Sequence, residues 1–424
     1  KTLVHGRTRP HCSRPAGELS VPRTSEGLCC HNQSMSATQQ PLVSALPSSA
    51  GRRLWLKHAW QLSAAGLAAA GGPAAWAAAG ATALQPLAPR TLVFPRDHGS
   101  HPELQTEWWY VTGHLRPRGN AGPAPSHGFQ ITFFRSRVAQ AEGIQSSFAA
   151  RQLLFAHAAI TDLARGELIH VQRMARQGHG WAQAGETDMA VHIGPWLLTS
   201  EATGRHAAKI ETDELLLDLK LTDSQPLVLQ GLDGLSRKGP LPEQASYYYS
   251  RPQLDVSGRI RTRHDRAPLD MTGTAWLDHE WSDALLSRDA EGWDWMGINF
   301  LNGSALTAFQ LRRPDGSALW TGGSWRQAGG QAHAFAPGEL KWSPGRIWTS
   351  PQSGARYPLA WQVDTPAGRF RVRALADPQE IDARASTGGI YWEGLCALSR
   401  ADSSETLGYG YLEMTGYHAP LRVS

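Results

Sequence analysis

The chain has 424 residues, which is enough for two or three domains with large cores. Its formal net charge is +4, but the first 81 residues contain 8 Lys and Arg against 2 Asp and Glu. The rest of the chain therefore holds 33 basic and 35 acidic residues, a balance that gives no support for a nucleic-acid partner.

The N-terminal region has the composition of a targeting segment. Residues 1–34 show no apolar period and are interpreted as a non-native upstream extension, with Met35 as the true start. Within residues 35–81, Arg52 and Arg53 precede bulky apolar residues, a lysine and a weakly apolar run that ends at small residues. This pattern resembles a twin-arginine signal peptide and predicts a periplasmic protein.

The alternative for the same region is a short membrane anchor. Residues 59–81 are long enough to span a bilayer, but several polar or helix-breaking residues make the run poorly apolar. No later stretch has the length and hydrophobicity of a spanning helix, so we expect no stable membrane span after signal cleavage.

Cysteine usage excludes some site chemistry. Three of the four cysteines precede Met35, so Cys396 is the one thiol after the leader. It can form no disulfide within that part of the chain and no cysteine-based zinc site, and we expect it to be a small buried residue.

The remaining chain reads as a short arm followed by many strands. Residues 82–105 are rich in proline and polar residues and predict an extended arm. From Thr106 onward, short β-branched and aromatic runs alternate with turn residues, and few stretches show a helical period. The pattern predicts an all-β fold with few short helices, built as a sandwich or a barrel.

A weak internal repeat supports two similar halves. An aromatic-rich strand ending at Gly113 precedes Phe129-Gln130-Ile131, and a second one ending at Gly297 precedes Phe309-Gln310-Leu311. This recurrence is typical of duplicated β-domains.

The stretch Gly273–Gly297 is the densest in chemical groups, with four Trp, four Asp, two Glu and one His. Read as a strand, it places Asp278 and Glu280 on one face and His279 and Trp281 on the other. Two carboxyl groups on one face repel each other when both are ionised, so one can have a raised pKa.

Several of these segments together resemble the CrtC/AttH family of lipocalin-like proteins. The resemblance rests on TEWWYVTG (106–113), YYYS (247–250), AWLDHEWS (275–282) and GWDW (292–295), with further support from YWEG (391–394) and the glycine- and tyrosine-rich end of the chain. It implies two tandem lipocalin-like antiparallel β-barrels packed together, which we expect over residues 106–270 and 271–424. One branch of the family is similar to carotenoid 1,2-hydratases, and the other consists of exported proteins often paired with transporter components.

The candidate site residues follow from the chemistry of hydration. Protonating a carbon–carbon double bond needs an acid, and the resulting cation needs aromatic faces and then water, without a cofactor. The catalytic candidates are Asp278, His279, Glu280 and Asp294. The candidates for the ligand-binding lining are Glu107, Trp108, Trp109, Tyr110, His157, Tyr248, Trp281, Trp293 and Trp295.

Alternatives stay open at this point. The same carboxyl and imidazole groups would serve equally as a buried polar network that fixes the junction of two barrels. A metal held by Asp278, His279 and Glu280 is disfavoured, because neighbouring strand residues point to opposite faces.

The functional expectation is therefore a binder of an apolar lipid or isoprenoid, in the first barrel or at the junction. Its enzymatic form would be a cofactor-independent hydro-lyase that hydrates a terminal C=C bond. The rival is a non-catalytic accessory binding protein of an envelope ABC transporter.

Overall fold

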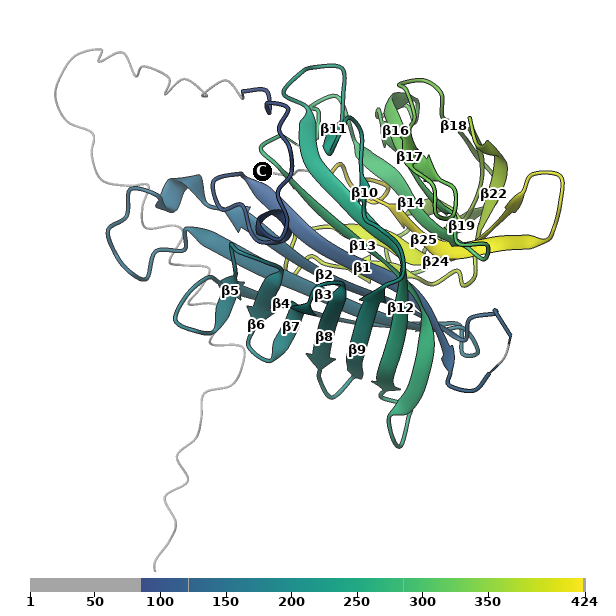
Figure 1. The fold of residues 1–424 in the computed structure, drawn as a ribbon, viewed down its shortest axis with the longest axis horizontal. Coiled ribbons are helices and arrows are strands. Elements are labelled where there is room, and N and C mark those ends of the chain that lie inside the picture. The colour runs from purple at the N-terminus through teal and green to yellow at the C-terminus, as the bar shows by residue number, and fades with distance from the viewer. Residues whose placement is uncertain (1–84, 121, 285, 422–424) are drawn as a thin grey trace, which may run out of the picture. The chain divides into compact units, whose positions relative to one another are not determined.

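The computed structural model describes residues 85–120, 122–284 and 286–421, so the predicted upstream extension and signal peptide lie outside the described residues. The described residues are almost entirely β, with two helical turns of 3-10 type, η1 (Arg96–His98) and η2 (Ala139–Ala141). Figure 1 shows the strands gathered into large curved sheets. The predicted all-β class with few short helices is confirmed.

The first sheet is a thirteen-stranded antiparallel array that runs in the order β4-β3-β2-β1-β13-β12-β9-β8-β7-β6-β5, with β10 and β11 paired to β12. Its strands are β1 (Thr106–Pro117), β2 (His127–Arg137), β3 (Gln152–Asp162), β4 (Glu167–Arg176), β5 (Ala182–Ala184), β6 (Ala190–Ile193), β7 (Trp196–Ala202), β8 (Arg205–Glu211), β9 (Leu215–Asp223), β10 (Val228–Leu229), β11 (Leu235–Arg237), β12 (Ala245–Thr262) and β13 (Leu269–Ser282).

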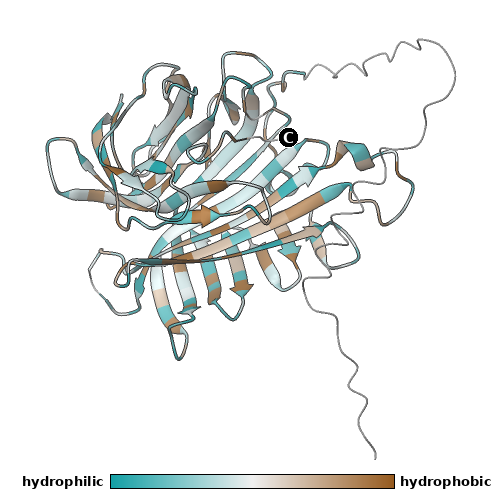
Figure 2. Cartoon of the chain, turned by 180° about the vertical axis from the view of Figure 1, so that it is seen from behind, coloured by the Kyte–Doolittle hydropathy of each residue, from teal (hydrophilic) through white to brown (hydrophobic). Residues whose placement is uncertain are grey.

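This sheet curls into a nearly closed barrel, because β3 and β4 at one end contact β5 and β6 at the other. Alternation along the strands directs apolar residues to its interior, as in β9, where Leu215, Leu217, Leu219 and Leu221 are all buried. Figure 2 shows this banding of hydrophobic and hydrophilic residues along the strands. Burying one face of each strand is what fixes the register of the sheet.

The second sheet has ten antiparallel strands in the order β17-β16-β15-β14-β25-β24-β22-β21-β18, with β23 paired to β24, and it forms a half-barrel. Its strands are β14 (Gly292–Phe300), β15 (Ala305–Arg312), β16 (Ala318–Arg326), β17 (Ala332–Ala334), β18 (Lys341–Pro344), β21 (Ala360–Thr365), β22 (Gly368–Ala374), β23 (Glu380–Asp382), β24 (Ile390–Arg400) and β25 (Thr406–Met414). A separate hairpin joins β19 (Ile347–Thr349) to β20 (Arg356–Pro358).

Both sheets arrange their first and last long strands in the same way. In each, the first long strand (β1 or β14) is flanked by its hairpin partner on one side and by the last strand of that sheet (β13 or β25) on the other. The repeat seen in the sequence corresponds to this shared arrangement.

The passage between the sheets differs from the expected boundary. Residues 269–282 pair with β1 and with β12 throughout their length, so β13 belongs to the first sheet. A division between residues 270 and 271 would therefore cut the start of a strand, and the chain enters the second sheet only at Gly292. Residues 273–297 are rich in aromatic and polar residues throughout. Their composition therefore gave no sign that β13 and β14 belong to different sheets.

The segment expected as an extended arm is partly built into the first barrel. Asp97, His98, Ser100 and His101 are all buried, and the helical turn η1 forms part of this segment. Composition predicted an extended arm, but polar side chains of the segment bond to buried partners of the first sheet such as Glu107 and Arg135.

The two sheets pack against each other through their closing strands. β1 contacts β25, β13 and β12 contact β14, and β2 contacts β24. A hydrophobic cluster that includes Tyr110, Trp276, Trp295, Phe309 and Tyr411 fills part of this junction.

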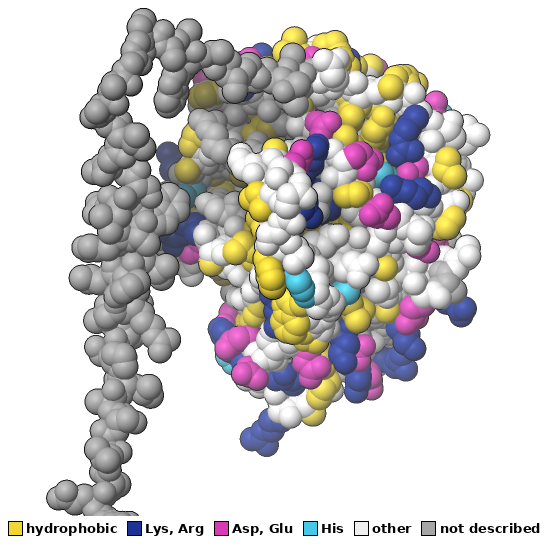
Figure 3. All heavy atoms as spheres, turned by 90° about the vertical axis from the view of Figure 1, so that its left-hand side faces the viewer, with side chains coloured by type: hydrophobic (Ala, Val, Ile, Leu, Met, Phe, Trp, Pro, Cys, Tyr) yellow, Lys and Arg dark blue, Asp and Glu magenta, His cyan; other side chains and the backbone are white. Residues whose placement is uncertain are grey.

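Among the described residues, no helix has the length and apolar character needed to cross a membrane. On the face shown in Figure 3, basic and acidic side chains lie interspersed.

Candidate functional site

A cavity of about 950 Å³ lies between the two sheets. Its walls come from β1, β2, β12 and β13 of the first sheet and from β14, β15, β24 and β25 of the second. The aromatic part of the lining is Trp108, Tyr110, Phe134, Phe155, Tyr248, Trp293, Trp295, Phe309 and Tyr391. The acidic part is Asp278, Glu280, Glu393 and Glu413.

Strand pairing explains why these side chains converge. Asp278 lies opposite Tyr110 of β1 and Ser250 of β12, and Glu280 lies opposite Trp108 and Tyr248. Directly paired residues of antiparallel strands project to the same face, so all of them face the second sheet. The predicted separation of Asp278 and Glu280 from His279 and Trp281 agrees with this arrangement.

Asp278 is a buried carboxylate surrounded by donors. Ser250 Oγ donates to its Oδ1 at 2.5 Å, Trp276 Nε1 donates to the same oxygen at 2.6 Å, and Tyr248 Oη donates to Oδ2 at 2.7 Å. Burial raises the pKa of Asp278 to about 7, although the three donors oppose the rise. The group can therefore accept or release a proton near neutral pH.

The hydroxyl groups around Asp278 are oriented by further donors. Gln230 Nε2 donates to Ser250 Oγ at 2.9 Å, and Trp295 Nε1 donates to Tyr248 Oη at 3.2 Å. Each hydroxyl thus has its own hydrogen free to point at Asp278. This arrangement favours a carboxylate that acts as a base.

Glu280 forms a buried ion pair. Lys238 Nζ lies 2.9 Å from Glu280 Oε1, and Ser246 Oγ donates to the same oxygen at 2.5 Å. The Lys238 ammonium also lies 4.6 Å from the centre of the Tyr248 ring and 4.3 Å from that of Phe309. The ammonium group therefore contacts one carboxylate and two aromatic rings.

Glu393 and Glu413 form a second acidic pair on the opposite wall. They lie directly across from each other on β24 and β25. Burial raises the pKa of Glu413 to about 7, with contributions from the charges of Asp278 and Glu280 and an opposing one from Trp293. Burial and the Glu413 charge hold the pKa of Glu393 well above its usual range. Ionising both of these neighbouring carboxyl groups is unfavourable because the two negative charges repel each other, so the pair retains a proton.

Two tyrosine hydroxyl groups border this acidic pair. Tyr110 and Tyr391 both interact with Glu393, and both contacts oppose the rise of its pKa. The neighbours of Glu393 that lower its pKa are therefore neutral hydroxyl groups.

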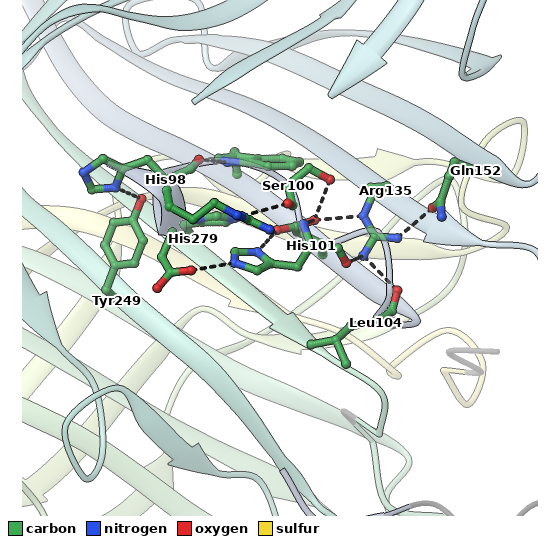
Figure 4. A network of polar contacts seen from close by, with 12 residues as sticks. His98, Ser100, His101, Leu104, Arg135, Gln152, Tyr249 and His279 are labelled. Carbon is green, nitrogen blue, oxygen red and sulfur yellow. Dashed lines mark hydrogen bonds and ion pairs between the residues drawn. The ribbon is translucent and has the colours of Figure 1, made fainter. Parts of the chain in front are cut away.

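The other face of β13 belongs to a separate network inside the first barrel, shown in Figure 4. Glu107 accepts hydrogen bonds at 2.9 Å from His279 Nε2 and at 2.8 Å from both His101 Nδ1 and Arg135 Nε. Burial alone would raise the pKa of Glu107, but His101, His279 and Arg135 hold it well below its usual range. Burial lowers the pKa of His279 to about 4.

This inner network fastens the chain before β1 to the barrel. Asp97 receives a bidentate pair of bonds from Arg90 and lies 3.0 Å from His101 Nε2. Arg135 Nη2 donates to the carbonyl oxygens of His101 and Leu104. Trp109 stacks on the ring of His279, and Trp281 stacks on that of His101.

The same network contains the one group of residues in the described part of the chain with the spacing of a metal site. Ligand atoms of His101, Glu107 and His279 lie within 4.8 Å of one another, a donor set suited to zinc. Both histidine nitrogens already bond to Glu107 Oε1, and the Arg135 guanidinium would repel a cation. The geometry therefore favours a structural latch.

Six predicted residues lie away from the cavity lining: Glu107, Trp109, His279 and Trp281, which belong to the inner network, and Asp294 and His157. Asp294 faces the interior of the half-barrel, where Arg312 Nε, Gln310 Nε2 and Tyr417 Oη surround it at 2.8–2.9 Å. His157 is buried between the sheets, with Ser386 Oγ 2.7 Å from Nε2 and Tyr391 Oη 2.9 Å from Nδ1. The predicted residues that line the cavity are Trp108, Tyr110, Tyr248, Asp278, Glu280, Trp293 and Trp295.

Among the ionisable residues of the cavity that sequence reasoning missed are Lys238, Glu393 and Glu413. The two glutamates stand in the YWEG and YLEM runs, each at an alternating position beside aromatic residues. That alternation could have flagged them as facing one side of a strand, but not as facing each other. Lys238 follows the short strand β11 and carried no comparable signal.

Comparison with known proteins agrees with this architecture. The family model described as AttH-like matches residues 85–417, so the chain belongs to the AttH-like family. The crystal structure of a protein assigned as AttH from Nitrosomonas europaea is 43% identical, with a TM-score of 0.71 over 79% of this chain and 100% of that one. Kievitone hydratase from Nectria haematococca shares the fold at 15% identity, with a TM-score of 0.59 over 79% and 98% of the two chains. No curated protein sequence matches the chain. The resemblance drawn from the motifs is confirmed.

Proposed function

We propose that the cavity between the sheets hydrates a carbon–carbon double bond of a largely apolar, isoprenoid-like ligand. The observation that carries the proposal is the convergence of two opposed acidic groups, Glu393 and Glu413, and an oriented carboxylate, Asp278, on one aromatic cavity. The predicted signal peptide would deliver this activity to the periplasm. Hydration is also compatible with the fold, because a protein named kievitone hydratase shares it.

The reaction divides between the two walls. A proton held by the Glu393 and Glu413 pair moves to one alkene carbon, the π bond breaks, and a carbocation forms at the other carbon. Aromatic faces such as those of Trp293 and Trp295 stabilise the cation. Water then attacks it while Asp278 takes a proton from that water, which gives the alcohol.

Proton balance is restored within the cavity. The reaction consumes one water and one alkene, and the proton gained by Asp278 replaces the one lost by the glutamate pair. Both carboxyl sites have pKa values near neutrality, which suits transfer in either direction.

The test uses the purified full chain, heavy-oxygen water and acyclic isoprenoids with terminal trisubstituted double bonds, such as squalene and lycopene. Mass spectrometry of the products should show one heavy oxygen per molecule with the wild-type protein. Glu413→Gln and Asp278→Asn should each lower the rate by about 100-fold or more, as expected when a general acid or base is removed.

Asp294→Asn provides a matched control, because Asp294 is a buried carboxyl outside the cavity lining. It should retain labelling wherever circular dichroism shows a folded protein. Recovery of bound but unlabelled ligand from the wild-type protein would contradict hydration and favour the transporter-associated binding protein.

A further inference from the structure

The charges around the cavity are unequally compensated. Four cationic side chains contribute to its lining, and each is already paired with an acid: Arg135 with Glu107, Arg137 with Glu142, Lys238 with Glu280, and Arg384 with Asp382. Three of these four acids lie outside the lining. The cations therefore leave no free positive charge for a ligand.

Three acids of the lining have no such partner. Asp278, Glu393 and Glu413 form no ion pair with any of the described residues. Their contacts are with neutral groups such as the Tyr248 hydroxyl and the Trp276 indole. The cavity thus carries an excess of negative charge whenever these groups are ionised.

The contacts of Lys238 show which groups of the cavity wall bind an ammonium. The Lys238 ammonium is held between the Glu280 carboxylate and the faces of Tyr248 and Phe309. Asp278 and Glu413 lie beside a comparable set of rings, those of Tyr110, Trp293 and Trp295, without a cation. Carboxylates combined with aromatic faces are the usual binding surface for organic ammonium ions.

We propose that this cavity selects lipophilic ligands that carry a positive charge over neutral ligands of the same chain length, and that it rejects fatty acids and other anionic lipids. The inference rests on the same cavity as the proposed function but not on turnover. A site that binds a stable ammonium in this manner also stabilises the short-lived cation of a hydration reaction.

The experiment compares three ligands with one alkyl chain: decyltrimethylammonium, decanol and decanoate. Each is titrated into the purified full chain by calorimetry, below its micellar concentration and at mildly alkaline pH. We expect the ammonium to bind about tenfold more tightly than the alcohol, and the carboxylate to bind most weakly. Equal binding of ammonium and alcohol, or tightest binding of the carboxylate, would overturn the proposal.

Variants locate the effect in the cavity. Asp278→Asn combined with Glu413→Gln should reduce the ammonium preference to about threefold or less while the affinity for decanol changes little. Glu405→Gln, an exposed carboxyl beside β25, is the control and should leave the preference intact. A preference that survives in a folded double variant would contradict the assignment to this cavity.

The two proposals can fail separately. If the protein binds the ammonium selectively but gives no labelled product, the hydration proposal is wrong and the proposed ligand class stands. Labelled product with no charge preference would remove the ligand class and leave the reaction.

Discussion

Glu107 and Glu413 show two opposite uses of an acidic residue in the same type of strand. Glu107 is fully buried and bonded to His101, His279 and Arg135, so its carboxylate is neutralised. Glu413 lines a cavity opposite a second glutamate, Glu393, and has no cation beside it among the described residues. Both residues lie within strands, so their place in a strand does not show which is structural and which is reactive. The difference lies in the counter-charge, which Glu107 has and Glu413 lacks.

The largest expected effect comes from breaking the compensated network. Arg135→Met removes the charge that neutralises Glu107 and the donor that holds the carbonyls of His101 and Leu104. We expect the free energy of unfolding to fall by about 3–5 kcal/mol, because an unpaired carboxylate would remain buried. Urea denaturation followed by fluorescence gives the value.

The matched control is Arg259→Met, which removes an exposed ion pair with Asp218. Such surface pairs contribute about 0–1 kcal/mol. Equal losses for the two variants would mean that the inner network is not a stabilising latch.

An intermediate effect is expected for the uncompensated pair, with the opposite sign. Glu413 has a folded-state pKa of about 7, above its ordinary value of 4.5, so the folded state binds protons more tightly than the unfolded state. Its contribution should make the protein less stable as pH rises from about 4.5 to about 7. Glu413→Gln should therefore raise the free energy of unfolding at pH 8 by about 1–3 kcal/mol, measured by urea denaturation.

Glu107, the acid that is paired with a cation, should instead affect the free energy of unfolding at acidic pH. The folded-state pKa of Glu107 is lowered, so its stabilising contribution is complete above the unfolded pKa of 4.5 and is lost as pH falls below it.

For the glutamate pair, the contradicting result comes from the Glu413→Gln variant. If its free energy of unfolding declines between pH 4.5 and 7 as much as that of the wild type, the role given to the pair is wrong.

The smallest effect is expected for a contact that joins the two sheets. Tyr391→Phe removes the hydroxyl that lies 2.9 Å from His157 Nδ1 and leaves that buried nitrogen without this partner. The cost should be about 1 kcal/mol. Because the same hydroxyl lowers the pKa of Glu393, that pKa should rise further in the variant. An unchanged Glu393 titration in carbon-13 NMR would argue against this contact.

Period-two alternation was sufficient to predict how β13 divides its side chains. It placed Asp278 and Glu280 opposite His279 and Trp281, and the contacts of the structure follow that division. The fold class could also be predicted, because turn residues and aromatic alternation recur along the chain. These features are local, and local pattern is what a single sequence records.

The remainder depended on pairing between distant segments. The opposition of Glu393 and Glu413 is a matter of register between β24 and β25, which no local pattern specifies. The burial of residues 97–101 likewise depends on Glu107 and Arg135 supplying partners. For the same reason Asp294 looked like an acid of the site, although its strand turns it toward Arg312.

The central claim is that the glutamate pair holds a proton near neutral pH, and carbon-13 NMR of glutamate-labelled protein tests it most directly. We predict one carboxyl resonance that titrates near pH 7 in the wild-type chain and is absent in Glu413→Gln. If all glutamate resonances that titrate in the folded protein do so below about pH 5, close to the ordinary range, the pair is not the acid of this cavity.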